Sequence, residues 1–281
     1  MFADNIIELE LSNTGEVIVS GVKEMSMLPY YPIIRVIATA YEIPQLGRKR
    51  RIAALLPHNY YETTKQYPVI YLNDGQNLFN DDAPYGNWKV DTSLQKLAEK
   101  GKGEVIIIAI DHGGKERIVE YSPYPNDKFG EAQGDLYLDF LINTLKPYVE
   151  RTFRVSSKRE NTGIGGSSMG GLISLYAGMK YSNVFGKLLV FSPSLWIAPQ
   201  MFEDTSKVKL AGFTKLYLYA GEKESKSHIP DLMRYYITIR RNKELIKDLD
   251  MEVSINPDGV HSEYCWEKEF PIALEWLFDN V

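Results

Sequence analysis

The sequence predicts an α/β fold: a mostly parallel central sheet with helices on both of its faces. Two observations support this prediction. Short, nearly continuous apolar runs, such as residues 67–72 and 105–110, are typical of strands buried on both faces of a parallel sheet. Segments with apolar residues at helical spacing lie between such runs, so that strands and helices alternate along the chain.

The N-terminal part of the chain is predicted to form antiparallel strand pairs. Residues 6–20 contain two short strand-like runs on either side of a turn at residues 13–15. Residues 33–42 and 50–57 form a second pair of the same kind. The basic run at residues 47–51 lies between them, and we expect a solvated hairpin tip there, because the chain as a whole is acidic.

From residue 67 onward the elements alternate, and the last helix is expected to cover an edge of the sheet. We therefore expect a single domain over residues 1–281, in which residues 1–32 are an N-terminal strand extension. Ligands of such sheets bind beyond the carboxyl ends of the strands. The predicted strands are residues 67–72, 105–110, 187–191, 215–220 and 251–255, and the predicted helices are residues 91–100, 135–150, a helix starting near Ser168, 229–248 and 265–278.

Composition excludes several classes of protein. The net charge of −5 argues against a dedicated nucleic-acid binder, whose affinity depends on neutralising phosphates. No apolar run approaches the length of a membrane span, and no signal peptide is recognised, so we expect no membrane partner. The single cysteine, Cys265, forbids an internal disulfide and suits a reducing compartment, which predicts a cytoplasmic location. The many aromatic residues leave a homo-oligomer possible.

A Gly-x-Ser-x-Gly motif at residues 166–170 organises the chemistry of the chain. Apolar residues follow it at helical spacing, which predicts a strand, a tight turn and a helix. A serine on such a turn is held in a strained backbone at the top of a sheet. Ser168 would also gain the positive field of a helix N-terminus, which stabilises an oxyanion. An ordinary loop or a phosphate cradle is the alternative explanation of this glycine-rich turn.

A serine hydroxyl needs a base to take its proton and a carboxylate to orient that base. His261 follows the last predicted strand, where the chain order serine, acid, histidine places the base. Glu224 and Glu222 both follow the preceding strand. We prefer Glu224, because its spacing from the glycine carries the carboxylate past the strand end. Asp258 is a weaker candidate, since it lies only three residues before the histidine.

Two backbone N–H groups are predicted to form an oxyanion hole. One belongs to Met169, directly after the serine, and the other to Gln76, in the loop that follows the strand at residues 67–72. Both groups act through the backbone, so substitution of the Met169 or Gln76 side chain does not test this role. An ordinary turn is the alternative explanation of the loop at residues 74–75.

Four further side chains are candidates for substrate contact, although each aromatic residue is equally open to a packing role. Trp196 is preferred, because it follows the strand next to the serine motif. His112 lies on another loop at a strand end. The remaining histidines, His58 and His228, are expected to be surface residues. The four candidates are Trp196, Trp88, Tyr121 and His112.

These motifs resemble the putative esterase family of the α/β-hydrolase superfamily, which includes esterase D-like enzymes, feruloyl and acetyl esterases, enterobactin esterases and mycolyltransferases. The resemblance covers residues 33 to 281 and implies the α/β-hydrolase fold. It places the family's nucleophile on Ser168 and its histidine on His261, and its acid similarly to Glu224. It also matches Gln76 to an oxyanion-hole residue of the mycolyltransferases. The motifs that carry it are residues 71–79, 145–148, 166–172, 192–196 and 259–266.

The resemblance implies acyl-ester chemistry without a metal or an organic cofactor. We therefore predict a serine esterase that hydrolyses an acylated sugar or another small acyl ester through an acyl-enzyme. An acyltransferase using the same residues is the second hypothesis, and a catalytically silent binding protein with a hydrolase fold is the third. A peptidase is a further, weaker alternative.

Overall fold

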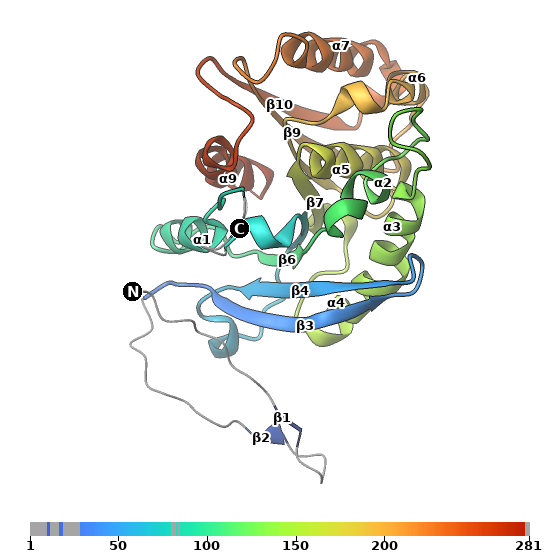
Figure 1. Ribbon diagram of the computed structural model, residues 1–281. Coiled ribbons are helices and arrows are strands. Elements are labelled where there is room, and N and C mark those ends of the chain that lie inside the picture. Colours follow the sequence, from blue (N-terminus) through green and yellow to red (C-terminus); the bar gives the residue numbers. More distant parts are fainter. Residues whose placement is uncertain (1–9, 12–16, 19–28, 80–82, 84, 279–281) are drawn as a thin grey trace.

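The computed structural model describes residues 10–11, 17–18, 29–79, 83 and 85–278 (Figure 1). At the N-terminus, strands β1 (Glu10–Leu11) and β2 (Val17–Ile18) pair antiparallel in a small sheet of their own. These two strands agree with the predicted pair at residues 6–20, whose turn lies outside the described residues.

Within the described residues, the central sheet has eight strands in the order β10-β9-β8-β7-β5-β6-β4-β3. The hairpin β3–β4 is antiparallel, as predicted, and β4 also pairs antiparallel with β6. Every other neighbouring pair is parallel, so the prediction of a mostly parallel sheet is confirmed. The strands are β3 (Ile33–Ile43), β4 (Arg48–Leu56), β5 (Val69–Asn73), β6 (Ile106–Ile110), β7 (Thr162–Ser167), β8 (Lys187–Phe191), β9 (Thr214–Gly221) and β10 (Leu249–Asn256).

Helices cover both faces of this sheet (Figure 1). On one face α1 (Val90–Ala98) packs beside α9 (Glu263–Leu277), and Trp88, Trp266 and Phe270 lie in the core between them and the strands. The apolar residues of the other helices pack on the opposite face. These helices are α3 (Gly134–Phe140), α4 (Lys146–Thr152), α5 (Met169–Lys180), α6 (Gln200–Thr205), α7 (His228–Arg241) and α8 (Lys243–Ile246), and the short α2 (Arg117–Glu120) contacts α3.

Three predicted helices differ in detail. The segment 135–150 is α3 and α4 joined by a π-helical turn, Leu141–Leu145. The segment 229–248 is broken at Asn242, whose side chain accepts from the N–H groups of Glu244 and Leu245 and so caps α8. Helix α9 packs on the face of β8 and β9, and the edge of the sheet is formed by β10, so the expected edge position of α9 is wrong.

The basic run at residues 47–51 is a solvated hairpin tip only at Gly47 and Lys49, which are exposed. Its arginines lie in β4 and form ion pairs with acidic side chains from later in the chain. Arg50 is 5% exposed and forms a two-pronged ion pair with Glu120, which is fully buried. Arg48 donates to Glu120 from the other side, at 2.7 Å. The sequence prediction failed because the partner lies 70 residues away along the chain.

The strand order reverses its direction between β5 and β7, which are neighbours in space. Chain connections leave toward β6 on one side of this pair and toward β8 on the other. Such a switch point opens a crevice at the carboxyl ends of the two strands. The loop at residues 74–77 follows β5 and the Gly-x-Ser-x-Gly motif ends β7, so both lie at this switch point.

Candidate active site

Ser168 stands on the tight turn between β7 and α5. Its backbone angles, φ 56° and ψ −118°, lie in a region that side-chain-bearing residues rarely adopt. The flanking glycines permit the turn, because a Cβ atom on Gly166 would sit 2.9 Å from the backbone of Gly170. The Ser168 hydroxyl is half-buried and lies 3.2 Å from the hydroxyl of Ser194. This strained serine at a helix N-terminus is the local structure that the motif predicts.

His261 and Glu224 are brought together by the loops that follow the last two strands. His261 Nδ1 lies 2.7 Å from Glu224 Oε2. The loops cross backbone to backbone: a Cβ atom on Gly221 would lie 2.3 Å from the carbonyl oxygen of Gly259, so only glycine fits. Glu222 is exposed, and the carboxylate in contact with the histidine is that of Glu224.

The Glu224 carboxylate is buried and well supplied with donors. Its side chain is 2% exposed. Oε1 accepts from the Ser192 hydroxyl at 2.6 Å and from the Gly221 N–H at 2.7 Å. Burial alone would raise the pKa of Glu224, but the hydrogen bonds from His261, Ser192 and Gly221 outweigh it and lower the pKa below the usual value. Glu224 is therefore ionised at neutral pH and accepts from the histidine.

The end of β8 links the serine turn to this acid–histidine pair. The carbonyl of Phe191 accepts from the Ser168 N–H at 2.9 Å. The next residue, Ser192, donates to Glu224 and accepts at 2.9 Å from the indole N–H of Trp266. The Trp266 ring packs edge-on against His261, with 4.9 Å between the ring centroids. A continuous set of contacts thus connects the three residues that the sequence singles out.

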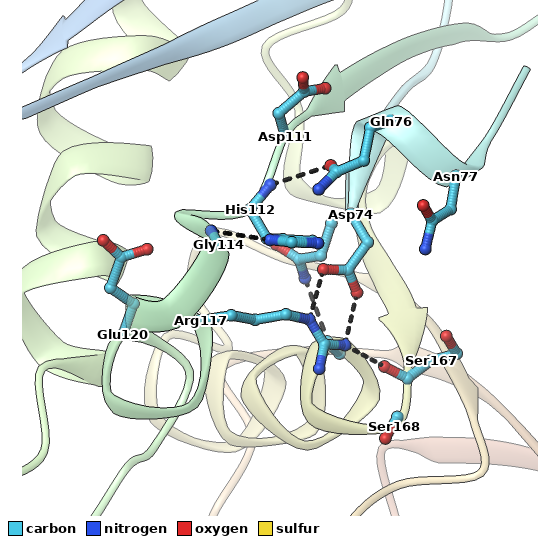
Figure 2. A network of polar contacts seen from close by, with 12 residues as sticks. Asp74, Gln76, Asn77, Asp111, His112, Gly114, Arg117, Glu120, Ser167 and Ser168 are labelled. Atoms are coloured by element: carbon cyan, nitrogen blue, oxygen red, sulfur yellow. Dashed lines mark hydrogen bonds and ion pairs between the residues drawn. The ribbon is translucent and has the colours of Figure 1, made fainter. Parts of the chain in front are cut away.

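A second polar network lies on the other side of Ser168 (Figure 2). Arg117 donates to both carboxylate oxygens of Asp74, at 2.7 and 2.8 Å, and to the carbonyl of Ser167 at 3.4 Å. Asp74 needs this support, because its φ of 61° is strained for a residue with a side chain. The pair fixes the loop after β5 against the end of β7.

His112 and Gln76 belong to the same network (Figure 2). The backbone N–H of His112 donates to Gln76 Oε1 at 3.0 Å, and the N–H of Gly114 donates to His112 Nδ1 at 2.9 Å. Burial lowers the pKa of His112, which favours the neutral ring at pH 7. Since Nδ1 is an acceptor, the neutral ring carries its proton on Nε2, where it is a donor.

Loss of the Arg117 side chain should destabilise the chain. In an Arg117→Met variant the Asp74 carboxylate, whose side chain is 7% exposed, loses its cation. We expect the free energy of unfolding to fall by about 3 kcal/mol, measured by urea denaturation. Lys115→Met is the matched control: the Lys115 side chain is 91% exposed, and its loss should change stability by about 0.5 kcal/mol or less. Equal effects of the two variants would contradict this prediction.

Two of the aromatic residues predicted to contact substrate are core residues instead. Trp88 is 2% exposed and stacks on Phe191, with 5.3 Å between the ring centroids. Tyr121 is fully buried beneath Arg117 and beside Tyr137. Neither presents a surface to a substrate, so these two predictions are wrong. The sequence could not separate packing from binding, because large aromatic rings serve both.

Trp196, in contrast, is 55% exposed. It follows Ser194, the contact of the Ser168 hydroxyl, and its ring meets Phe129 edge-on with 5.9 Å between the centroids. The Nζ atom of Lys128 lies 6.0 Å from the indole centroid. The partly exposed indole is compatible with substrate contact, and the role of Trp196 in substrate binding remains a prediction.

Alanine substitutions should separate the two tryptophans. Trp88→Ala is expected to lower the free energy of unfolding by about 3–5 kcal/mol, because it leaves a cavity in the core. Trp196→Ala should cost about 0.5 kcal/mol or less and should raise KM for an ester substrate about three- to tenfold. Thermal denaturation and steady-state kinetics on both variants check this. A stability loss in Trp196→Ala as large as that in Trp88→Ala would contradict the assignment.

The two predicted oxyanion-hole residues occupy suitable elements. Met169 is the first residue of α5, where N–H groups have no acceptor within the helix. Gln76 lies in the 3-10 turn Gly75–Asn77, directly after β5. A Cβ atom on Gly75 would lie 2.8 Å from the backbone nitrogen of Ile110, so the turn is packed tightly against β6. The role of the two N–H groups remains a prediction.

Sequence analysis missed several polar residues of this site. Ser192 and Ser194 were noticed only as part of a family motif, and Arg117 was not singled out. His228 was expected at the surface, but its side chain is 10% exposed and faces Glu224. The position of His228 alone could have been inferred from the sequence. It follows Glu224 by four residues, a spacing that places two side chains on the same side of a helical turn.

Neither a metal site nor a membrane span is found in the part of the chain that the structure describes. No three His, Cys, Asp or Glu side chains there are grouped closely enough to bind a metal ion. None of the described helices has the length and apolar character needed to cross a bilayer.

The sheet order, the helices on both faces and the tight turn between β7 and α5 define an α/β-hydrolase fold. The predicted fold class is thereby confirmed. The chain belongs to the family described as Putative esterase, which matches residues 43–277, and it is a carboxylic-ester hydrolase. This confirms the family and the ester chemistry that the resemblance implied.

The chain is similar to several individual proteins. The chain is 26% identical over 243 residues to the uncharacterized protein YbbA of Bacillus subtilis, which covers 82% of this chain and 92% of that protein. It is 30% identical over 138 residues to the siderophore triacetylfusarinine C esterase of Aspergillus fumigatus, a match that covers 46% of this chain and 44% of that protein. An IroE-like serine hydrolase from Shewanella oneidensis has a similar structure, with a TM-score of 0.70, 19% identity, and coverage of 88% and 80%.

Proposed function

We propose that the chain is a serine esterase in which Ser168 is the nucleophile, His261 the general base and Glu224 the orienting acid. The observation that carries this proposal is the 2.7 Å contact between His261 Nδ1 and Glu224 Oε2, at the same end of the sheet as the strained serine. With Nδ1 bound to the carboxylate, Nε2 is left unprotonated and available as a base.

The proposed reaction has two steps. In the first, Ser168 Oγ attacks the acyl carbon while His261 Nε2 takes its proton, and the imidazolium then returns that proton to the departing alcohol. In the second, His261 takes a proton from water, the resulting nucleophile attacks the acyl-enzyme, and the proton returns to Ser168 as the acid leaves. The buried, ionised Glu224 stabilises the imidazolium that forms in each step.

Two backbone N–H groups, those of Met169 and Gln76, are proposed to bind the tetrahedral oxyanion. Each such donor contributes about 2.7–4 kcal/mol of transition-state stabilisation in serine hydrolases studied by mutation. The Arg117–Asp74 pair supports this arrangement, because it holds the loop of Gln76 against Ser167.

For the substrate we propose a small acyl ester, such as an acylated sugar. The exposed Trp196 next to Ser194 supports a ring-shaped substrate group, because indole rings stack on sugars and aromatic rings alike. The siderophore esterase relative matches less than half of this chain, so its substrate is one member of the panel to be tested. The expected cytoplasmic location, supported by the unpaired buried Cys265, also stays a proposal.

A fluorophosphonate probe tests the nucleophile directly. We expect it to label the chain stoichiometrically, with the mass shift on the peptide that contains Ser168, and to abolish hydrolysis of a short-chain nitrophenyl ester. Absence of labelling and of turnover in folded protein would favour the silent binding protein. Acyl transfer to an added alcohol in preference to water would favour the acyltransferase, and cleavage of amides over esters would favour the peptidase.

A further inference from the structure

A second imidazole lies against the acid of the proposed triad. His228 is the first residue of α7, and its Nε2 atom is 3.2 Å from Glu224 Oε2, the same oxygen that contacts His261 Nδ1. The two imidazole rings are 6.2 Å apart and nearly perpendicular. His228 Nε2 is buried and makes no hydrogen bond of acceptable geometry, so its contact with Glu224 is close but poorly aligned.

The donors around Glu224 divide unevenly between its two oxygens. Oε1 is committed to the Ser192 hydroxyl and the Gly221 N–H. Oε2 faces both histidines and has a well-formed hydrogen bond with His261 only. A positive charge on His228 would turn the poorly aligned contact into an ion pair with Oε2, in direct competition with His261.

The charged groups that face His228 come from three elements. Glu224 lies on the loop after β9, His261 on the loop after β10, and Asp231 on α7 itself. Burial lowers the pKa of His228, and a charge on His261 lowers it further, while Glu224 and Asp231 act in the opposite direction. His228 is therefore neutral at the pH where the esterase is expected to work.

We propose that His228 is a positioning residue for ester hydrolysis, which supports Glu224 while it is neutral and withdraws Glu224 from His261 when it is protonated. This inference depends on the proposed triad. Neutral His228 fills the space beside Oε2 and leaves that oxygen to His261. Protonated His228 places a second positive charge beside the imidazolium that catalysis must form, and that imidazolium also loses its carboxylate partner.

The pH dependence of kcat/KM tests this role, because ester substrates such as nitrophenyl acetate carry no titratable group themselves. On the acidic limb, log(kcat/KM) of wild type should fall with a slope of 1, and the slope should then rise to 2 as His228 is protonated. In the His228→Gln and His228→Phe variants the slope should stay at 1, because the second protonation is absent. The glutamine keeps polarity and the phenylalanine keeps ring volume, so one of them serves if the other does not fold.

His58→Gln is the matched control. His58 follows β4, whose last residues pair with the start of β6, at the opposite end of the sheet from Ser168. Its profile should superimpose on that of wild type. Circular dichroism at each pH restricts the comparison to folded protein. The pKa of Glu224 is held below its usual value, so protonation of Glu224 falls at the acidic end of the profile.

The outcomes separate this inference from the function on which it rests. If the acidic limb of the wild-type pH profile has the same slope as the limbs of both His228 variants, and Ser168→Ala is inactive, the role of His228 is overturned and the triad stays in place. Full activity in Ser168→Ala overturns the triad and the positioning role with it. A steeper wild-type limb that both His228 variants abolish and His58→Gln retains supports the proposal.

Discussion

Replacing Ser168 by alanine is expected to lower kcat for ester hydrolysis about 10⁶-fold, since loss of the nucleophile in a well-studied serine protease has that effect. The remaining rate would come from oxyanion stabilisation and substrate binding, which do not need the hydroxyl. The fold should persist, because alanine keeps the hydrogen bond from the backbone N–H of residue 168 to the carbonyl of Phe191 and gives up the hydroxyl contact with Ser194. Initial rates on a nitrophenyl ester, with the near-UV spectrum as the check on folding, measure this.

The neighbouring serine provides the control. Ser167 is the preceding residue of the same motif and is 5% exposed. Its carbonyl accepts from Arg117, a contact that alanine preserves. Ser167→Ala should therefore retain kcat within about threefold, because it leaves the Ser168 nucleophile and the backbone contact with Arg117 in place. Loss of activity in both variants would mean that the turn, rather than the Ser168 hydroxyl, had been disturbed.

Glu224→Gln is expected to lower kcat about 10⁴-fold. The amide has nearly the shape of the carboxylate, so Ser192 and Gly221 can still donate to its oxygen. It carries no charge, however, and its NH₂ group would favour the tautomer of His261 that has the proton on the wrong nitrogen. Single-turnover kinetics should show that the loss lies in the chemical steps, with KM changed little.

Glu222→Gln tests whether position or charge matters at this loop. Glu222 is exposed, two residues before Glu224, and lacks the contact with His261. Its substitution should leave kcat/KM within about twofold, since an isolated surface charge contributes little. If Glu222→Gln were the more damaging variant, the acid of the triad would have been assigned to the wrong residue.

The alternation of buried strands and helices was predictable because a parallel sheet covered on both faces leaves continuous apolar runs. Positions of Ser168, Glu224 and His261 were predictable for a related reason: strand ends in such a sheet meet at one edge. What the sequence lacked was information on side-chain partners far away in the chain. Arg50 looked solvated because Glu120 is 70 residues distant.

The residues around the site were harder to interpret for physical reasons. Trp88 and Trp196 both follow strands, yet one is 2% and the other 55% exposed, a difference set by helices α1 and α9 that pack over Trp88. His228 was expected at the surface, but it faces the buried carboxylate of Glu224. The backbone crossing of Gly221 and Gly259 brings the loop of His261 to Glu224, whereas His228 follows Glu224 by four residues.

Strand β10 forms an edge of the sheet, with β9 as its partner, and all its residues after Leu249 are at least partly exposed. His261, the base of the proposed triad, lies on the loop that follows this strand, whereas Ser168 follows the central β7. Edge elements open locally at a lower free energy than the core requires for global unfolding. Enzyme activity should therefore disappear on heating before the domain melts, and amide hydrogen exchange should be faster in β10 than in β7.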